Sequence, residues 1–153
     1  MMRPFSPPHR CQHARGGFTL IELLVAAVLV AILAAIALPA FFEQLARARR
    51  TDVETALLED AGYMQRYYGA HNGYTGAAVP QLSVVRSPRQ GSASYDITVN
   101  VAADDPSSFV LTARRTGAMS SDVCGDFTYD NLGRRGLVAG TFASGRSAAS
   151  CWR

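Results

Sequence analysis

The sequence has little of what a catalytic or metal-binding site requires. It contains only three histidines: His9 and His13 lie in the first 17 residues, and His71 stands alone in a glycine-rich stretch. We find no metal-ligand cluster of adequate spacing, no phosphate-binding loop and no nucleophile–base pair. The aspartates at 104–105 and at 122–130 do not follow a calcium-loop pattern. The sequence therefore predicts a protein that is not an enzyme, with no metal and no cofactor.

Lysine is absent, and charged residues make up only 18 % of the chain. All 15 basic residues are arginines, and three of them, Arg3, Arg10 and Arg15, lie before residue 18. Without these three, the 12 remaining arginines equal the 12 acidic residues, so the formal charge falls from +3 to 0. A role in nucleic-acid binding based on net charge loses its support if residues 1–17 are removed.

What the chain does have is a long apolar run behind a basic head. Residues 1–17, MMRPFSPPHRCQHARGG, show no helical or strand periodicity and are expected to be an unstructured, cytoplasm-facing leader. Residues 18–42 follow, with no charge from Leu23 to Phe42. As a helix they span roughly 36 Å, enough for a bilayer core of about 30 Å. Pro39 predicts a kink or local melting near the far end.

An amphipathic pattern begins where the apolar run ends. Apolar residues recur at spacings of three to four, which predicts a helix with one buried face; they are Val53, Leu57, Ala61, Met64 and Tyr68. No stop signal separates the two segments, so we expect one long rod that ends around Gly69 to Gly73. The alternative is a capping box at Thr51 and Glu54, which would start a separate helix.

The second half of the chain reads as loop followed by strands. Residues 74–93 are loop-like, with prolines, glycines and serines. Alternating apolar residues predict strands in SYDITVNVA and FVLTARR, a third strand at Phe127–Tyr129, and a fourth near Leu137. The predicted fold class is α+β: a long N-terminal α-helix packed on a small, about four-stranded antiparallel β-sheet.

Glu22 is the unusual residue of the apolar segment. An unpaired carboxylate at the edge of an apolar helix costs several kcal/mol in lipid. A cut between Gly17 and Phe18 would place a new α-amino group one helical turn from Glu22. The amine could meet its own Glu22 or that of a neighbouring subunit, and the second arrangement would set the axial register of two packed helices.

A basic leader that ends in glycine, then Phe-Thr-Leu-Ile-Glu, then a long apolar helix, resembles the type IV pilin family. The resemblance implies that a prepilin peptidase cuts after Gly17 and methylates Phe18, and that Glu22 and Pro39 correspond to the family's glutamate and helix-breaking proline. It implies a single-pass inner-membrane protein with a cytoplasmic N-terminus, which assembles with other pilin subunits at an assembly platform into an extracellular filament. The expected organisation is a removed leader, 1–17, a membrane and filament-core segment, 18–42, and a globular head, 43–153. One departure is that residues 23–38 contain no glycine, so unwinding on assembly would depend on Pro39.

The competing interpretation is an ordinary secretory signal peptide, with cleavage near Ala35-Ile36-Ala37 and a soluble product that starts at Leu38. Glu22 at the start of the apolar core and the amphipathic continuation argue against it. Within the pilin superfamily, a type II secretion pseudopilin is the alternative.

Cysteine usage fits the same resemblance. Cys11 lies in the leader, and its loss leaves Cys124 and Cys151, an even pair suited to an oxidising compartment. The alternative is two unpaired buried thiols. A bond between them would close a loop of about 27 residues, worth roughly 3.5 kcal/mol by chain entropy. The tail CGDFTYDNLGRRG…ASCWR is similar to minor pilins of the PilE and ComP kind, in which such a loop fastens the C-terminus to the sheet.

The remaining arginines raise the question of DNA. Minor pilins that resemble the ComP kind capture DNA, and arginines with nearby aromatic side chains could contact phosphates and bases. The candidate set is Arg114, Arg115, Arg134, Arg135 and Arg146. The favoured interpretation is instead a solvated set balanced by Asp122, Asp126 and Asp130.

Overall fold

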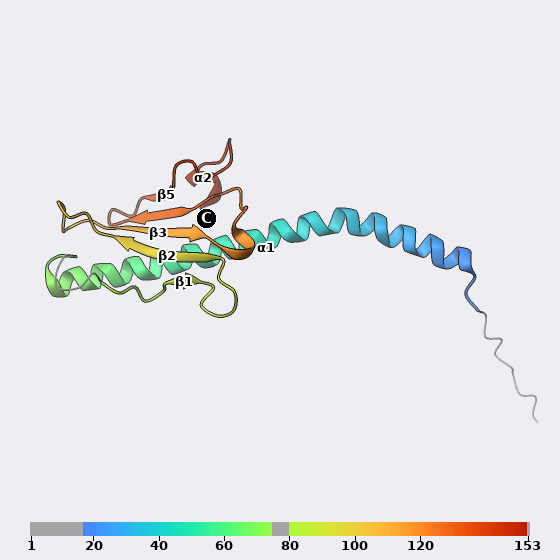
Figure 1. Ribbon diagram of the computed structural model, residues 1–153, viewed down its shortest axis with the longest axis horizontal. Coiled ribbons are helices and arrows are strands. Elements are labelled where there is room, and N and C mark those ends of the chain that lie inside the picture. The colour runs from blue at the N-terminus through green and yellow to red at the C-terminus, as the bar shows by residue number, and fades with distance from the viewer. Residues whose placement is uncertain (1–16, 75–79, 153) are drawn as a thin grey trace, which may run out of the picture. The chain divides into compact units, whose positions relative to one another are not determined.

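The computed structural model describes residues 17–74 and 80–152 (Figure 1). The elements are a long helix α1 (Leu20–His71), strands β1 (Arg86–Ser87), β2 (Tyr95–Asn100) and β3 (Val110–Arg115), a 3₁₀ turn η1 (Gly117–Met119), strands β4 (Phe127–Asp130) and β5 (Arg135–Leu137), and a short helix α2 (Ala148–Cys151). The chain divides into two compact units, Met1–Ala40 and Phe41–Arg153, which we describe separately. The predicted leader, apart from Gly17, lies outside the described residues.

Helix α1 is uninterrupted over 52 residues, as the single-rod prediction required. The alternative of a second helix that starts at Thr51 is wrong. The Thr51 hydroxyl donates to the Arg47 carbonyl oxygen at 3.2 Å, a bond that threonine makes inside a helix and not at an N-cap. The helix ends at His71, and Asn72 adopts a φ of 56°, a left-handed conformation common just after a helix.

Pro39 lies inside α1, and the helix continues through it. The expected local melting is therefore not present in the separate chain. Proline removes one backbone donor, but the alanines and leucines on both sides of it favour helix. Whether Pro39 breaks the helix during assembly stays a prediction.

The sheet has five antiparallel strands in the order β1-β2-β3-β4-β5. The first three predicted strands correspond to β2, β3 and β4. The fourth was expected to begin near Leu137, whereas β5 begins at Arg135 and ends at Leu137. The count of about four was one too low. The additional strand is β1, in the segment that the sequence indicates is a loop. Two residues are too short to show an alternating pattern, and β1 pairs only through Arg86 opposite Asp96 and Ser87 opposite Tyr95.

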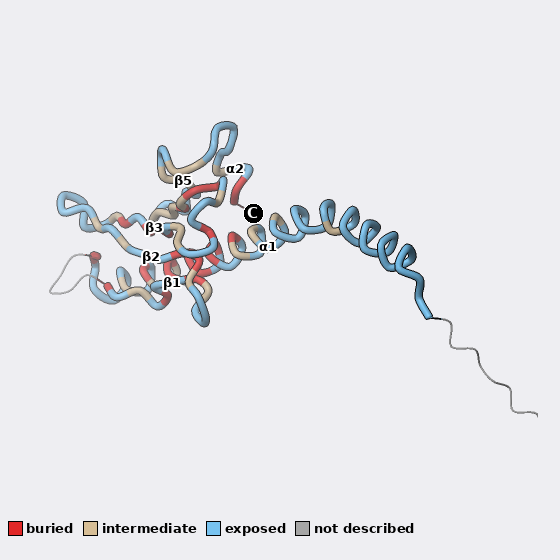
Figure 2. Tube along the Cα trace, turned by 45° about the vertical axis from the view of Figure 1, so that its right-hand side comes forward, coloured by how far each residue is buried: buried red, intermediate tan, exposed pale blue. Residues whose placement is uncertain are grey.

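The core of the second unit lies between α1 and the inner face of the sheet (Figure 2). On α1, Val53, Leu57, Ala61 and Met64 are at most 3 % exposed, as the periodicity predicted. Tyr68, the last residue of that pattern, is 36 % exposed and contacts Tyr74 instead, so its predicted burial was wrong.

The strands alternate as expected, and they contribute five buried side chains to the core: Tyr95, Ile97, Leu111, Ala113 and Phe127. Phe109, which directly precedes β3, is buried as well. The aromatic members meet edge to face, with ring centroids of Tyr95 and Phe127 5.8 Å apart.

Candidate functional site

The start of α1 is built by Thr19. Its hydroxyl oxygen accepts the Glu22 backbone N–H at 3.3 Å, and its carbonyl oxygen accepts the Leu23 N–H at 3.3 Å. Thr19 is therefore an N-cap, and Glu22 is the third residue of the helix, where a carboxylate is favoured by the free N–H groups. Phe18 precedes the cap and is 76 % exposed. The spacing Thr-x-x-Glu is the capping signature that the sequence analysis placed at Thr51 instead of here.

The apolar half of α1 has no cover in the single chain. Every residue from Gly17 to Phe42 is exposed except Ala34, which is half-buried. Large side chains such as Leu20, Leu33 and Ile36 are 68–81 % exposed. The stretch is long and apolar enough to cross a membrane. An exposed apolar surface of this size is unfavourable in water, so lipid or other protein is expected to cover it.

The C-terminal half of α1 is fixed to the rest of the head by a buried ion pair. Arg50, 7 % exposed, donates from Nε to Asp122 Oδ2 at 3.0 Å and pairs through Nη2 with Asp122 Oδ1. This two-point contact raises the pKa of Arg50. Asp122 also accepts the Cys124 backbone N–H at 3.3 Å. One carboxylate thus links α1 to the loop that leads into the disulfide.

A second buried carboxylate fixes the segment before β1. Asp60 on α1 has no exposed surface, and its Oδ1 accepts the Val84 backbone N–H at 3.0 Å. Its Oδ2 has no hydrogen-bond partner among the described residues. Burial raises the pKa of Asp60 to about 6, against the hydrogen bonds from Val84 and Ser83, which lower it.

The C-terminal tail is closed as expected. Cys124 and Cys151 form a disulfide with a sequence separation of 27 and a Cα–Cα distance of 5.7 Å. Trp152, beside it, donates its indole N–H to the Gly136 carbonyl oxygen at 2.9 Å and meets Phe127 edge to face. The alternative of two unpaired thiols is therefore wrong, and the disulfide and Trp152 together hold the tail against β4 and β5.

The candidate DNA-contacting arginines do not form one free cluster. Arg115 donates to Asp126 Oδ1 at 3.1 Å, and Arg134 donates to Asp130 Oδ2 at 2.6 Å. The Arg135 guanidinium carbon lies 5.5 Å from the centroid of the Trp152 ring. Arg114 and Arg146 are exposed and form no ion pair with another described residue. Asp126 and Asp130 therefore neutralise two of the five arginines. Asp122 was expected to balance this set too, but its carboxylate pairs with Arg50 instead.

Within residues 17–74 and 80–152, no group of three or more histidine, cysteine, aspartate or glutamate side chains could hold a metal ion. The capping role of Thr19 and the structural roles of Arg50, Asp60 and Asp122 were not predicted from the sequence. Only Thr19 had a local signal, its spacing to Glu22, because the other contacts join residues 24 or 72 positions apart.

Comparison with known proteins gives two family matches. The family described as type IV minor pilin ComP, DNA uptake sequence receptor, matches residues 39–128, and the prokaryotic N-terminal methylation motif matches residues 12–38.

Three curated pilins are similar to the chain. The wide pilus major component PilA4 of Thermus thermophilus is 35 % identical over 104 residues, 66 % of this chain and 74 % of its own. The major fimbrial protein FimA of Dichelobacter nodosus is 30 % identical over 118 residues, 67 % of this chain and 73 % of its own. The major pilin PilA of Myxococcus xanthus is 31 % identical, but the match covers only 46 % of its length.

Two solved structures are also similar. A type IV pilin from Shewanella oneidensis has a TM-score of 0.46 at 24 % identity and covers 63 % of this chain and 97 % of its own. The non-core minor pilin PilV of Neisseria meningitidis has a TM-score of 0.45 at 20 % identity and covers 60 % and 85 %.

The family assignment follows from the sequence matches, which include the segment that holds Gly17, Phe18 and Glu22 and most of the described head. The ComP model alone spans more than half of the chain, and the curated relatives reach 30–35 % identity. The chain belongs to the type IV pilin family and is a structural subunit of a type IV pilus.

Proposed function

We propose that the chain is a minor pilin made as a precursor. A prepilin peptidase cuts it between Gly17 and Phe18 and methylates the new terminal residue. Residues 18–42 hold it in the inner membrane as a single pass with the N-terminus cytoplasmic, and an assembly platform moves it into the filament. The minor role rests on the match to the ComP family alone. The curated relatives are named as major subunits and do not support it.

The observation that carries this proposal is the contrast along α1. One continuous helix is exposed and apolar up to Phe42, yet from Val53 to Met64 it buries one face in the head. The same apolar surface can face lipid before assembly and neighbouring helices afterwards, because both media exclude water. A helix that only contributes to the core of a soluble protein would have these apolar side chains buried, not exposed to solvent.

Glu22 gives the assembly step its specificity. After cleavage, the new amine is on Phe18, which precedes the N-cap Thr19 and stands four residues before Glu22. The Thr19 hydroxyl accepts the backbone N–H of Glu22, and the Glu22 carboxylate forms no ion pair with another residue that the structure describes. In a bundle of helices, pairing Glu22 with the amine of a neighbour removes two charges from an apolar medium. We therefore assign Glu22 to the register between subunits.

The test separates processing from assembly. Glu22→Ala should be cut and methylated normally, as measured by intact mass, but should be absent from sheared filaments. Glu22→Gln is the matched control for size, and it should fail in the same way because it lacks the charge. Filaments of normal yield from both variants would refute the role of Glu22. Scoring twitching, DNA uptake and protein secretion in a deletion strain distinguishes a pilus from a secretion pseudopilus.

A second candidate function is DNA uptake, which the description of the matching family favours. The chain offers Arg114 and Arg146 as exposed arginines without an ion pair among the described residues, and Arg135 stacked near Trp152. Loss of duplex DNA binding in the Arg114→Ala/Arg146→Ala double variant, with a steep salt dependence in the unchanged protein, would support this function. Unchanged binding would exclude these arginines as the contact.

A further inference from the structure

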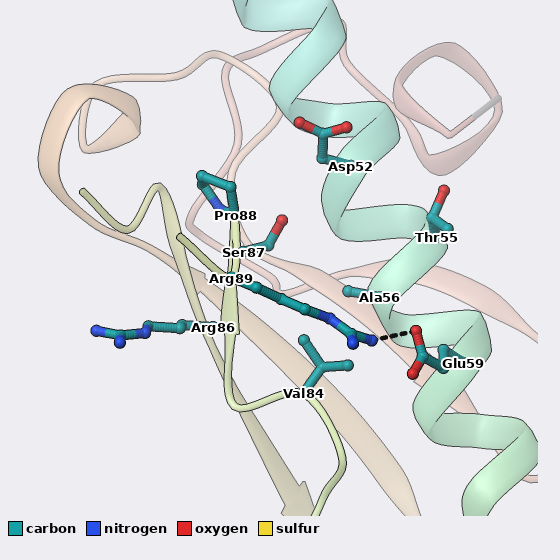
Figure 3. A pocket seen from close by; sticks show the side chains of 9 residues that line it. All are labelled: Asp52, Thr55, Ala56, Glu59, Val84, Arg86, Ser87, Pro88 and Arg89. Carbon is teal, nitrogen blue, oxygen red and sulfur yellow. Dashed lines mark hydrogen bonds and ion pairs between the residues drawn. The ribbon is translucent and has the colours of Figure 1, made fainter. Parts of the chain in front are cut away.

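The outer face of the sheet is the surface turned away from α1, which packs on the inner face (Figure 2). Residues directly opposite each other in paired strands share a face, and their neighbours along each strand lie on the other face. Ser87 and Tyr95 are opposite each other and buried, so Arg86 and Asp96 lie on the outer face. In Figure 3 the Arg86 side chain points away from α1.

A row of three charged side chains crosses β1, β2 and β3 on this face. Arg86 is opposite Asp96, and Asp96 is opposite Arg114. All three are exposed, and none forms an ion pair with another residue in 17–74 or 80–152. Because neighbouring strands lie about 4.8 Å apart, the backbones of the two arginines are about 10 Å apart, with the carboxylate between them. The row therefore has two separated cations around one anion.

A row of hydroxyl groups runs beside the charged row, two residues further along the strands. Thr98, Thr112 and Thr128 lie directly opposite one another on β2, β3 and β4. The Thr98 hydroxyl donates to the Thr112 carbonyl oxygen at 3.4 Å, whereas the hydroxyls of Thr112 and Thr128 bond to no other described residue. Gly136 is opposite Thr128 on β5, and a Cβ there would lie 2.5 Å from the Thr128 hydroxyl oxygen. The glycine therefore leaves this hydroxyl accessible.

The outer face is hollowed where the hydroxyl row reaches β4 and β5. A cavity of about 300 Å³ lies there, and its lining includes Val110, Thr128, Asp130 and Gly136. Val110 is 41 % exposed and offers an apolar surface. The charge of Asp130 is balanced by Arg134, which donates to its carboxylate at 2.6 Å. The face thus combines an apolar contact, hydroxyl groups and two arginines without ion pairs to other described residues.

These groups fit a linear polysaccharide with one carboxylate on every second sugar. Two sugar rings of such a chain span about the 10 Å that separates the arginine backbones, so each guanidinium can pair with one carboxylate. Asp96 can accept hydrogen bonds from sugar hydroxyls between them, and the threonines can donate and accept others. We propose that the outer face of the sheet binds an acidic polysaccharide laid across β1 to β4, with Arg86 and Arg114 paired to its carboxylates.

Duplex DNA fits this face less well. Each DNA strand has one phosphate for about every 3.4 Å of the helix axis, so a strand that reached both arginines would also place phosphate beside Asp96. Asp96 repels an anion at that position, since no described residue pairs with it. A polysaccharide with spaced carboxylates presents hydroxyls there instead. The order of charges in the row therefore favours spaced anions over a continuous line of them.

Binding of the full-length protein in detergent to immobilised hyaluronan, which has one carboxylate on every second sugar, tests the contact. Arg86→Ala and Arg114→Ala should each weaken binding about tenfold. Thr112→Val keeps the size of the side chain without the hydroxyl and should weaken binding about threefold. Arg66→Ala is the matched control, because it removes an exposed arginine of α1 that has no described ion pair, and it should leave binding unchanged.

Two other polymers separate the ligand classes. Neutral dextran and duplex DNA should bind at least about tenfold more weakly than hyaluronan. Asp96→Asn should raise the affinity for DNA about tenfold and leave that for hyaluronan almost unchanged, because it removes only the repulsion. This gain of binding also requires a folded head, so it distinguishes a changed surface from lost structure.

Several results would overturn the inference. They are absence of hyaluronan binding, equal binding of dextran, an equal loss in Arg66→Ala, and DNA binding that exceeds hyaluronan binding in the unchanged protein. Unchanged DNA affinity in Asp96→Asn would contradict the role of that carboxylate. The contact uses only the head and goes beyond the proposed role in assembly, so a chain that forms no filaments would refute that role and leave this binding test intact.

Discussion

Asp60 allows a sharp test of how the head is held together. Its carboxylate is fully buried on α1 and binds the Val84 N–H, and burial raises its pKa from 3.8 to about 6. A group whose pKa is raised on folding favours the folded state when it is protonated. Its contribution is therefore fully present below pH 4 and is lost as the pH rises through 6.

The size of the effect follows from the shift. Each pKa unit corresponds to 1.36 kcal/mol, so a shift from 3.8 to about 6 amounts to about 3 kcal/mol lost between pH 4 and pH 7. Asp60→Asn removes the titration, and its side-chain oxygen can still accept the Val84 N–H. The stability of the variant relative to the unchanged protein should therefore rise by about 3 kcal/mol over this pH range.

The assay is urea unfolding of the full-length protein in detergent, followed by circular dichroism at pH 4, 5, 6 and 7. Other carboxylates, such as Glu43 with its pKa lowered by the Arg47 hydrogen bond, titrate in both proteins and cancel in the difference. Asp52→Asn, which changes an exposed carboxylate of the same helix that forms no ion pair with another described residue, is the control and should leave the pH dependence almost unchanged. Stability curves for Asp60→Asn and the unchanged protein that run parallel from pH 4 to pH 7 would refute the reasoning.

Three further predictions concern named contacts. Arg50→Ala should destabilise the head by about 3–5 kcal/mol, because it leaves Asp122 buried without its partner. Urea unfolding should show a smaller loss of stability in the double variant Arg50→Ala/Asp122→Ala than in Arg50→Ala alone. Cys124→Ser/Cys151→Ser should lower stability by about 2–5 kcal/mol, and a melting temperature equal to that of the unchanged protein would contradict a stabilising role. Glu22→Ala should leave the melting temperature of the head unchanged while it abolishes filaments, since Glu22 contacts nothing in the head; a large fall in that temperature would argue against a role confined to assembly.

The sequence allowed the helices and strands with strong local patterns to be predicted. The periodicity of Val53, Leu57, Ala61 and Met64 identified the buried face of α1, and the alternation around Ile97 and Leu111 identified two strands. The motif around Glu22 resembles that of the type IV pilin family. The cost of a carboxylate at the edge of an apolar helix indicated separately that Glu22 has a function. Each of these signals lies within a few residues of chain.

The rest depended on contacts that join distant positions. Arg50 and Asp122 are 72 residues apart, and Asp60 and Val84 are 24 apart, so no local pattern marks either pair. An arginine and two acids on the buried face of α1 would count against burial in any periodicity analysis. Strand β1 was missed for a related reason: its two residues are placed by pairing with β2 and not by their own preference.

The central claim is that this chain is cut at Gly17 and works through the helix that then begins at Phe18. The most direct test is the exact mass and N-terminal sequence of the protein recovered from membranes. We predict a chain that begins at an N-methylated Phe18. A soluble chain that begins at Leu38 would contradict the account, because it would lack Glu22 and most of the apolar helix on which assembly depends.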